Sequence, residues 1–275
     1  MSEGLLDAGR PRHHFRLRER RRNMGFQRVM GAVCAAVVTA LGAAGPSGAR
    51  PVVVELFTSQ GCNACPPADA LLGELAARDD VIALALHVDY WDYLGWRDVF
   101  GSAANTRRQR SYLRTLGGRT VFTPQLVIDG ALALPGARRA DVLDEIAIAR
   151  ATPHAAAVAL ERDPDGMVIR VDGEAQDNPA RVLFFVFEPP HVVTPTRGEN
   201  VGRPLVYHNA VRFWMTLGWW RGGEQVWRAP APEDARGVAA LVQRRDGVII
   251  GAAQRLMNGA APAVSEVSGA AISAP

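Results

Sequence analysis

Two cysteines separated by two residues are the side chains of this sequence that most directly suggest chemistry. Cys62 and Cys65 follow a glycine turn and precede two prolines, at the point where an apolar strand pattern changes into a helical one. The N-terminus of a helix stabilises a thiolate, and a thiolate is the species that attacks a disulfide. The second sulfur lies close enough to resolve a mixed disulfide. We therefore expect Cys62 to be the nucleophile and Cys65 the resolving thiol.

Three other roles are open for these cysteines. A structural disulfide is the first, although a loop this short gains little unfolded-state entropy from being closed. It would make the protein a non-catalytic binding module. A zinc site needs about four ligands, more than two cysteines supply, and we expect no metal and no cofactor. A copper metallochaperone that uses His87 as a third, nitrogen ligand is the remaining alternative.

The elements around the cysteines follow an α/β pattern. We expect strands over residues 51–58 and 81–88 with a helix over 68–78 between them, which together form a right-handed βαβ unit. A second helix over 103–116, strands over 123–128 and 131–134 joined by Asp129-Gly130, and a helix over 137–150 complete the domain. The arginines at positions 107, 108, 110 and 114 should form the solvated face of the second helix.

From residue 151 the pattern changes to short β segments. We expect strands over residues 155–160, 167–171, 182–188, 205–216, 224–228, 237–244 and 248–253. Short strands with regular turns indicate a smaller all-β, sandwich-like domain over residues 151–257. Residues 258–275 are mostly alanine, serine, glycine and proline, which cannot bury a core, and we expect a disordered tail.

Residues 1–49 have the pattern of a secretory signal peptide. A basic segment is followed by the apolar run 29–41, which contains Cys34, and then by small residues. The basic stretch before Met24 is long, which favours Met24 as the true start. An uncleaved membrane anchor is the alternative, but the run is shorter than the roughly 20 residues that a bilayer span needs. We expect a periplasmic or secreted protein that meets a membrane only if this segment stays attached.

The charge of the mature chain differs from that of the whole sequence. The leader holds eight of the 31 basic residues and three of the 28 acidic ones, so the mature chain has a net charge of −2. The basic excess therefore gives no argument for nucleic-acid binding, and we expect no nucleic-acid partner. In an oxidising compartment the two remaining cysteines have only each other as partners.

The motif and its context resemble known families. The segment Gly61-Cys62-Asn63-Ala64-Cys65-Pro66, with Thr123-Pro124 downstream, resembles the thioredoxin superfamily over residues 50–150. The longer phrases ELFTSQGCNACPPADALLGELA, HVDYWDYLGW, TPQLVIDG and YHNAVR resemble an exported family that carries only a domain-of-unknown-function label, DUF1223. That family combines a thioredoxin-like fold with a C-terminal β region.

The thioredoxin resemblance also implies roles for other residues. A cis bond between Thr123 and Pro124 would turn the main chain of Thr123 toward the sulfurs, where it could hold a substrate chain. Such proteins often carry a buried acid that helps to deprotonate the resolving cysteine. Glu55 is the candidate for that proton relay, but it lies one residue from the usual spacing, and such an offset reverses the face of a strand. The alternative is that Glu55 is an exposed or salt-bridged strand residue.

The segment after the second strand should lie near the cysteines, because loops at the carboxyl ends of parallel strands gather at one edge. Asp89, Tyr90 and Trp91 are thus candidates for substrate binding, with Gln60 in the turn before Cys62. The alternative is a packed cap over the sheet. The expected partners are the thiols of exported proteins or a redox partner protein.

Overall fold

The computed structural model describes residues 50–257 and 265–266, which belong to one compact unit. The expected leader and most of the expected tail lie outside the described residues. Within the tail, Ser265–Glu266 forms the short strand β14, which pairs in parallel with β8 (His191–Val193). No helix in the described part of the chain is long and apolar enough to cross a membrane.

The first sheet has the order β2-β1-β3-β4. Its strands are β1 (Val52–Thr58), β2 (Val81–His87), β3 (Gln125–Ile128) and β4 (Leu132–Pro135). β1 pairs in parallel with β2 and antiparallel with β3, and β3 forms a hairpin with β4. Every residue of β1 and β2 is buried, which explains why both strands are nearly continuous in apolar residues rather than alternating.

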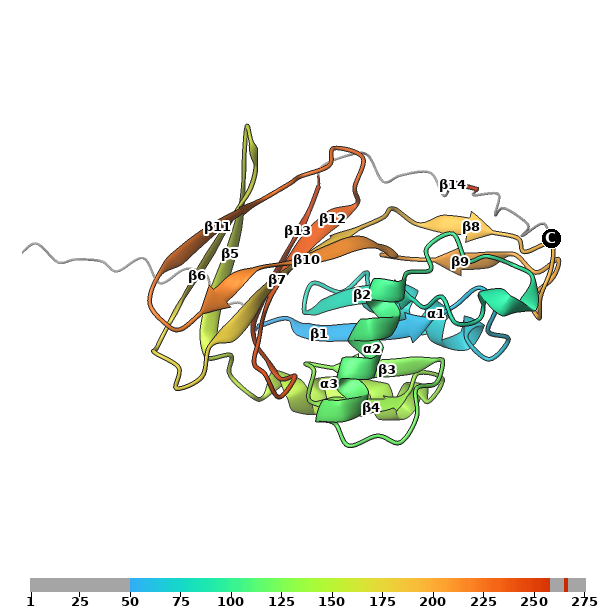
Figure 1. The fold of residues 1–275 in the computed structure, drawn as a ribbon, viewed down its shortest axis with the longest axis horizontal. Coiled ribbons are helices and arrows are strands. Elements are labelled where there is room, and N and C mark those ends of the chain that lie inside the picture. The colour runs from blue at the N-terminus through green and yellow to red at the C-terminus, as the bar shows by residue number, and fades with distance from the viewer. Residues whose placement is uncertain (1–49, 258–264, 267–275) are drawn as a thin grey trace, which may run out of the picture. The chain divides into compact units, whose positions relative to one another are not determined.

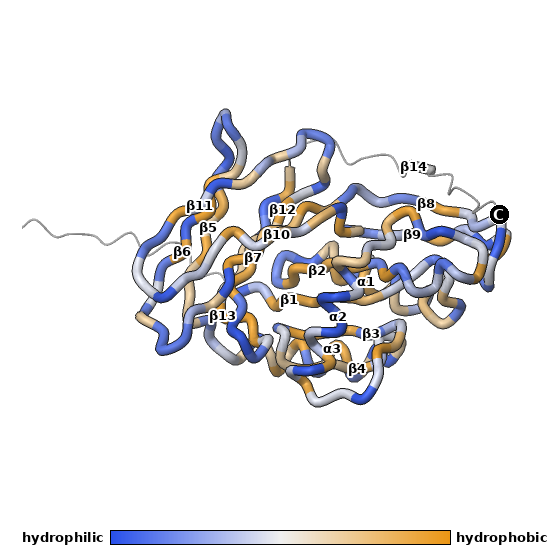
Figure 2. The backbone as a smooth tube through the Cα atoms, viewed as in Figure 1, coloured by the Kyte–Doolittle hydropathy of each residue, from blue (hydrophilic) through white to orange (hydrophobic). Residues whose placement is uncertain are grey.

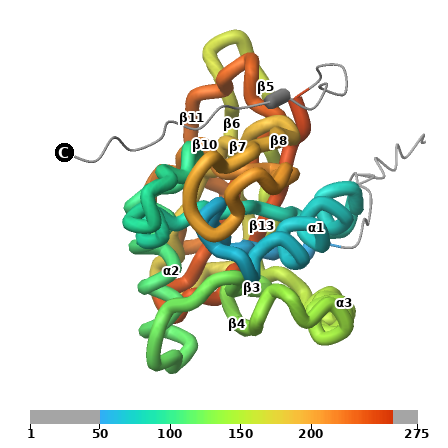
Figure 3. The backbone as a smooth tube through the Cα atoms, turned by 90° about the vertical axis from the view of Figure 1, so that its right-hand side faces the viewer, coloured from blue at the N-terminus to red at the C-terminus, as the bar shows by residue number. Residues whose placement is uncertain are grey.

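Helices cover both faces of this sheet. α1 (Pro66–Leu75) and α3 (Arg139–Arg150) pack on one face, around Val52, Val54 and Leu56. α2 (Ala103–Thr115) packs on the other face, where Val53 and Phe57 point, and Figure 3 shows it on the opposite side of the sheet from α1 and α3. Successive residues of β1 therefore serve two different cores.

The second half of the chain forms further sheets, shown in Figure 1. One has the order β10-β7-β12-β13, a second has β11-β6-β5, and a third has β14-β8-β9. The strand bounds are β5 Ala156–Asp163, β6 Gly166–Gly173, β7 Ala180–Phe187, β9 Leu205–Tyr207, β10 Val211–Trp220, β11 Gln225–Ala229, β12 Gly237–Gln243 and β13 Ile249–Leu256. The single strand expected over residues 205–216 is thus two strands, separated where Asn209 adopts a positive φ of 50°. β8 was not expected.

The two halves share one of the buried apolar clusters of the described residues. Phe185 of β7 and Leu241 of β12 pack with Val53 of β1 and Leu84 of β2 in a single apolar cluster. The hydropathy colouring of Figure 2 shows β1 and β2 as hydrophobic elements in the middle of the molecule. On either side of residue 151, each half therefore has an apolar cluster of its own, and the two halves share a further one.

Two tight turns also join the halves. The N–H of Ile249 donates to the carbonyl of Asp129 at 2.8 Å. A Cβ on Gly130 would lie 2.0 Å from the carbonyl oxygen of Gly247, and both glycines have positive φ, at 63° and 98°. Only residues without a side chain allow these turns to meet so closely.

A buried ionic network links β1, α2 and β12. Arg108 of α2 donates to both carboxylate oxygens of Glu55 and to Gln243, and the Tyr112 hydroxyl also donates to Glu55. Arg108 is 3% exposed and Glu55 is fully buried. The expectation that Arg108 lies on a solvated helix face is therefore wrong, because the second half of the chain covers that side of α2. The neighbouring Arg107 is exposed.

Candidate functional site

Cys62 and Cys65 form a disulfide at the turn between β1 and α1. The strand ends at Thr58, a tight turn brings the Cys62 N–H to the carbonyl of Ser59, and Cys65 is the N-cap of α1. Two prolines then occupy the first helical positions, where the missing N–H groups cost nothing. Both cysteines are buried, with exposed fractions of 2% for Cys62 and zero for Cys65.

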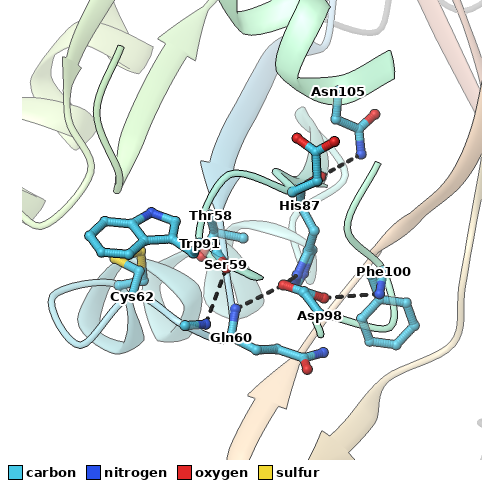
Figure 4. Close-up of polar contacts among 12 residues, drawn as sticks. Thr58, Ser59, Gln60, Cys62, His87, Trp91, Asp98, Phe100 and Asn105 are labelled. Carbon is cyan, nitrogen blue, oxygen red and sulfur yellow. Dashed lines mark hydrogen bonds and ion pairs between the residues drawn. A yellow bond between two sulfur atoms is a disulfide. The ribbon is translucent and has the colours of Figure 1, made fainter. Parts of the chain in front are cut away.

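Trp91 covers the turn that carries Cys62. A Cβ on Gly61 would lie 2.9 Å from the Cβ of Trp91, and Figure 4 draws the indole in front of Cys62. The indole Nε1 donates to the Thr123 hydroxyl at 2.8 Å, and Tyr93, which is 77% exposed, stacks on its outer face. Because Cys62 has almost no exposed surface, an attacking thiol needs this cover to move.

Replacing Trp91 with alanine should therefore speed reduction of the disulfide by dithiothreitol about tenfold. The variant loses the hydrogen bond to Thr123, worth about 1 kcal/mol, together with indole packing, and 1.4 kcal/mol corresponds to a factor of ten. The rate is measured by alkylating the released thiols and recording the mass shift. The matched control is W219A, because Trp219 lies on the surface of β10. Equal rates for W91A and the native protein would show that Trp91 does not limit access.

Below the turn lies a buried polar network, shown in Figure 4. The Nδ1 atom of His87 lies 2.8 Å from Asp98 Oδ2, which also accepts the Gln60 N–H at 2.8 Å. Gln60 accepts the Trp96 indole N–H through its side-chain oxygen. Burial alone lowers the pKa of His87, but the charge and hydrogen bond of Asp98 outweigh it and raise that pKa above 6.5. The expected substrate contact Gln60 is thus fully buried and holds the turn instead.

Asp69 is the buried acid on the side of the cysteines. It lies one helical turn after Cys65, its N–H donates to the Cys65 carbonyl, and its Oδ1 accepts the Thr58 hydroxyl at 2.7 Å. It is 5% exposed, and its Oδ2 has no hydrogen-bond partner among the described residues. Burial raises its pKa from 3.8 to about 7, against the opposing effects of His87 and Thr58. A carboxyl with this pKa can exchange a proton near neutral pH.

The structure does not place Glu55 with the cysteines. Thr58 contacts α1, whereas Glu55 lies on the other face of β1 and contacts Arg108 and Tyr112 of α2. This corrects the expectation of a proton relay at Glu55, because successive strand residues point to opposite faces. Of the two interpretations of Glu55, the salt-bridged strand residue is the one the contacts match.

The other predicted site residues divide into two groups. Asp89 accepts a hydrogen bond from Thr106, and the Tyr90 hydroxyl donates to Gln109, so both side chains are held by α2. Trp91 is the member of this segment that lies against the CxxC turn, and both Trp91 and Tyr90 reach the Thr123 hydroxyl. The Thr123-Pro124 bond is cis, as expected.

Comparisons with known proteins place the chain in a family. Residues 53–243 match the family model described as "Protein of unknown function (DUF1223)". The chain belongs to the DUF1223 family. A crystal structure of protein AGR_C_4864 from Agrobacterium tumefaciens is 33% identical, with a TM-score of 0.65, over 77% of this chain and 96% of that one. HBP35 of Porphyromonas gingivalis shares the fold at 17% identity, with a TM-score of 0.53 over 77% and 76% of the chains. No curated protein matches the chain.

Sequence reasoning missed several residues that build the site in this DUF1223 chain. Asn200 donates from its side-chain nitrogen to the carbonyls of Gln60 and Cys62, and Glu199 accepts the Asn63 N–H. Asp98 holds Gln60 and His87. No local pattern marks them, since Asn200 lies 138 positions after Cys62 in the chain. The position of Asp69, one helical turn after Cys65, could have indicated a role beside the cysteines. Acidic residues are also common in the first turn of any helix, so this position alone does not distinguish it.

The described residues contain no group of three or more His, Cys, Asp or Glu side chains arranged to hold a metal ion. The His87 ring is engaged by Asp98 through Nδ1 and is fully buried against Tyr207, with 4.6 Å between ring centroids. The described residues therefore lend no support to the copper alternative.

Proposed function

We propose that this protein is an exported, periplasmic or secreted, thiol–disulfide oxidoreductase that exchanges disulfides with another exported protein. In this proposal residues 50–150 form a thioredoxin-like α/β domain, followed by a smaller all-β region. The observation that carries it is the disulfide at the N-terminus of α1, one helical turn from a buried carboxyl whose pKa is raised to about 7. The export part rests on the sequence of residues 1–49.

The exchange reaction follows from the order of the two sulfurs. In the reduced protein, the Cys62 thiolate attacks one sulfur of a substrate disulfide, and the other substrate sulfur leaves as a thiolate. The Cys65 thiol then loses its proton and attacks Cys62, which re-forms the Cys62–Cys65 disulfide and releases the second substrate thiolate. Two electrons pass to the substrate, and the reverse sequence oxidises a substrate dithiol.

Asp69 is the proton acceptor that fits the second step. Its carboxyl lies one helical turn from Cys65 on the same side of α1, and it is withdrawn from solvent. Because its pKa is about 7, it is partly ionised at neutral pH and can take the thiol proton. Thr58 fixes one carboxylate oxygen and leaves Oδ2 for the proton.

Trapping of mixed disulfides tests the proposal. Replacing Cys65 with serine blocks the resolving step, so C65S should accumulate covalent complexes in the exporting cell that dithiothreitol releases. C62S is the matched control and should accumulate few, because the attacking sulfur is absent. Equal numbers of complexes with C65S and C62S would contradict the roles assigned to the two sulfurs.

The burial of both cysteines favours one second candidate, a non-catalytic binding module with a structural disulfide. The reduction potential of the Cys62–Cys65 pair separates the two functions. A potential above about −250 mV corresponds to exchange-competent disulfides, and one below about −300 mV to structural ones. The potential is obtained by alkylating thiols in glutathione and dithiothreitol buffers, and the proposal expects the higher range.

A further inference from the structure

A loop from the second half of the chain forms part of the CxxC site. Residues 194–204 connect β8 to β9, and the buried residues at the two ends of this loop, Val193 and Leu205, pack with Trp96 in a small apolar cluster. A Cβ on Gly198 would lie 3.7 Å from the Cβ of Trp96. The loop is therefore anchored on the segment that follows β2, directly beside the turn that carries Cys62.

Asn200 fastens this loop to the turn. Its side-chain nitrogen donates to the carbonyl of Gln60 at 2.9 Å and to the carbonyl of Cys62 at 3.0 Å. Asn200 is 3% exposed, so these bonds form away from water. The Cys62 carbonyl also accepts the N–H of Cys65. One side chain thus fixes the main chain on both sides of Gly61.

Glu199 is held at the cysteines by its neighbour. Its Oε2 accepts the N–H of Asn63 at 3.3 Å, and Asn63 lies between the two cysteines. Main-chain N–H groups at the start of a helix are the donors that stabilise a cysteine thiolate in this position. The Asn63 N–H lies just before this helix start, so a carboxylate bound to it adds a negative charge beside Cys62, the residue whose sulfur becomes anionic on reduction.

We propose that Glu199 lowers the reduction potential of the Cys62–Cys65 pair and that Asn200 positions Glu199 to do so. Reduction adds two electrons and, with Cys62 as a thiolate, one proton, which Cys65 carries. The carboxylate opposes the new charge on Cys62 and so favours the disulfide over the dithiol. This assignment rests on the proposed function only in taking Cys62 as the thiolate. It makes the pair a better reductant and favours substrates that are themselves disulfides.

The test compares equilibrium constants with glutathione for the native protein and E199Q. The neutral amide should shift the equilibrium toward the dithiol by about threefold to tenfold, and tenfold corresponds to about 30 mV. Because Glu199 is exposed, E199Q should fold normally. E233Q is the matched control, since Glu233 is an exposed carboxylate on the loop between β11 and β12. A shift below twofold for E199Q, or a shift toward the disulfide, would overturn the proposal.

Asn200 gives a second, independent variant. N200A should shift the equilibrium in the same direction as E199Q, because the freed loop no longer holds the carboxylate at Asn63. The double variant should shift it no further than E199Q alone, since two changes that act through one contact are not additive. An additive double variant would show that Asn200 does not act through Glu199. A native potential below about −300 mV would end the proposed function and leave the comparison of E199Q with E233Q valid.

Discussion

Replacing Asp69 with asparagine should prevent most of the stability loss that the native protein undergoes as the pH rises from about 4 to 7. Burial raises the pKa of Asp69 from 3.8 to about 7, so the folded state holds the proton more tightly than the unfolded state. The native protein therefore loses free energy of unfolding as pH rises through this range, and the loss is complete above pH 7. Asparagine never ionises and still accepts the Thr58 hydroxyl.

The expected size follows from the shift of about three pKa units. Each unit corresponds to 1.36 kcal/mol. Between pH 4 and pH 8, the free energy of unfolding of D69N should therefore rise by about 2–4 kcal/mol relative to that of the native protein. His87 contributes in the same sense, because its raised pKa gives stability that is present at low pH and lost as pH rises through the folded-state pKa. Most of that contribution remains in D69N, because Asp98 raises the pKa of His87 more than Asp69 does.

Urea denaturation of the oxidised protein at pH 4, 6 and 8 measures the difference. D144N is the matched control, since Asp144 is exposed on α3. If the free energies of unfolding of the native protein and D69N changed with pH in the same way, Asp69 would ionise as freely in the folded state as in the unfolded one.

The same variant should also slow the release of substrate from the mixed disulfide without slowing its formation, because only the second step uses the Asp69 carboxylate.

Replacing Arg108 with alanine should lower the free energy of unfolding by about 3–5 kcal/mol, because it leaves the fully buried Glu55 carboxylate without its counter-ion. The guanidinium also lies over three aromatic rings, with centroid distances of 5.2 Å to Tyr112 and Phe185 and 5.5 Å to Trp214. Its loss therefore weakens the packing between α2 and the second half of the chain as well. Chemical denaturation at pH 7 measures the change.

Two further variants separate the charge from the packing. R107A removes an exposed arginine of the same helix and should change stability by less than about 0.5 kcal/mol. The double variant E55L/R108M removes both charges together and should be more stable than R108A, because no uncompensated ion stays buried. If R108A and R107A were equally stable, the Glu55–Arg108 pair would not carry the stability assigned to it.

Local signals in the sequence determined much of this protein. The nearly continuous apolar run before the cysteines matches β1 (Val52–Thr58), and the prolines after them begin α1 (Pro66–Leu75). The turn residues at Asp129-Gly130 correctly predict the hairpin of β3 and β4. The position of the disulfide pair at a strand-to-helix turn follows from the same patterns. Each of these features depends on residues within a few positions of one another, so the sequence carries it directly.

Tertiary structure alone decided which acid accompanies the cysteines and which residues complete their site. Glu55 and Asp69 are both acids near the motif, but the alternation of β1 sends Glu55 to α2, while the helical turn keeps Asp69 beside Cys65. Arg108 is buried because β7, β10 and β12 cover a helix face whose arginines predict exposure to solvent. Asn200 meets Cys62 across 138 positions of chain. Such pairings depend on how elements dock, and no local pattern of residue types encodes which distant segment fills a given surface.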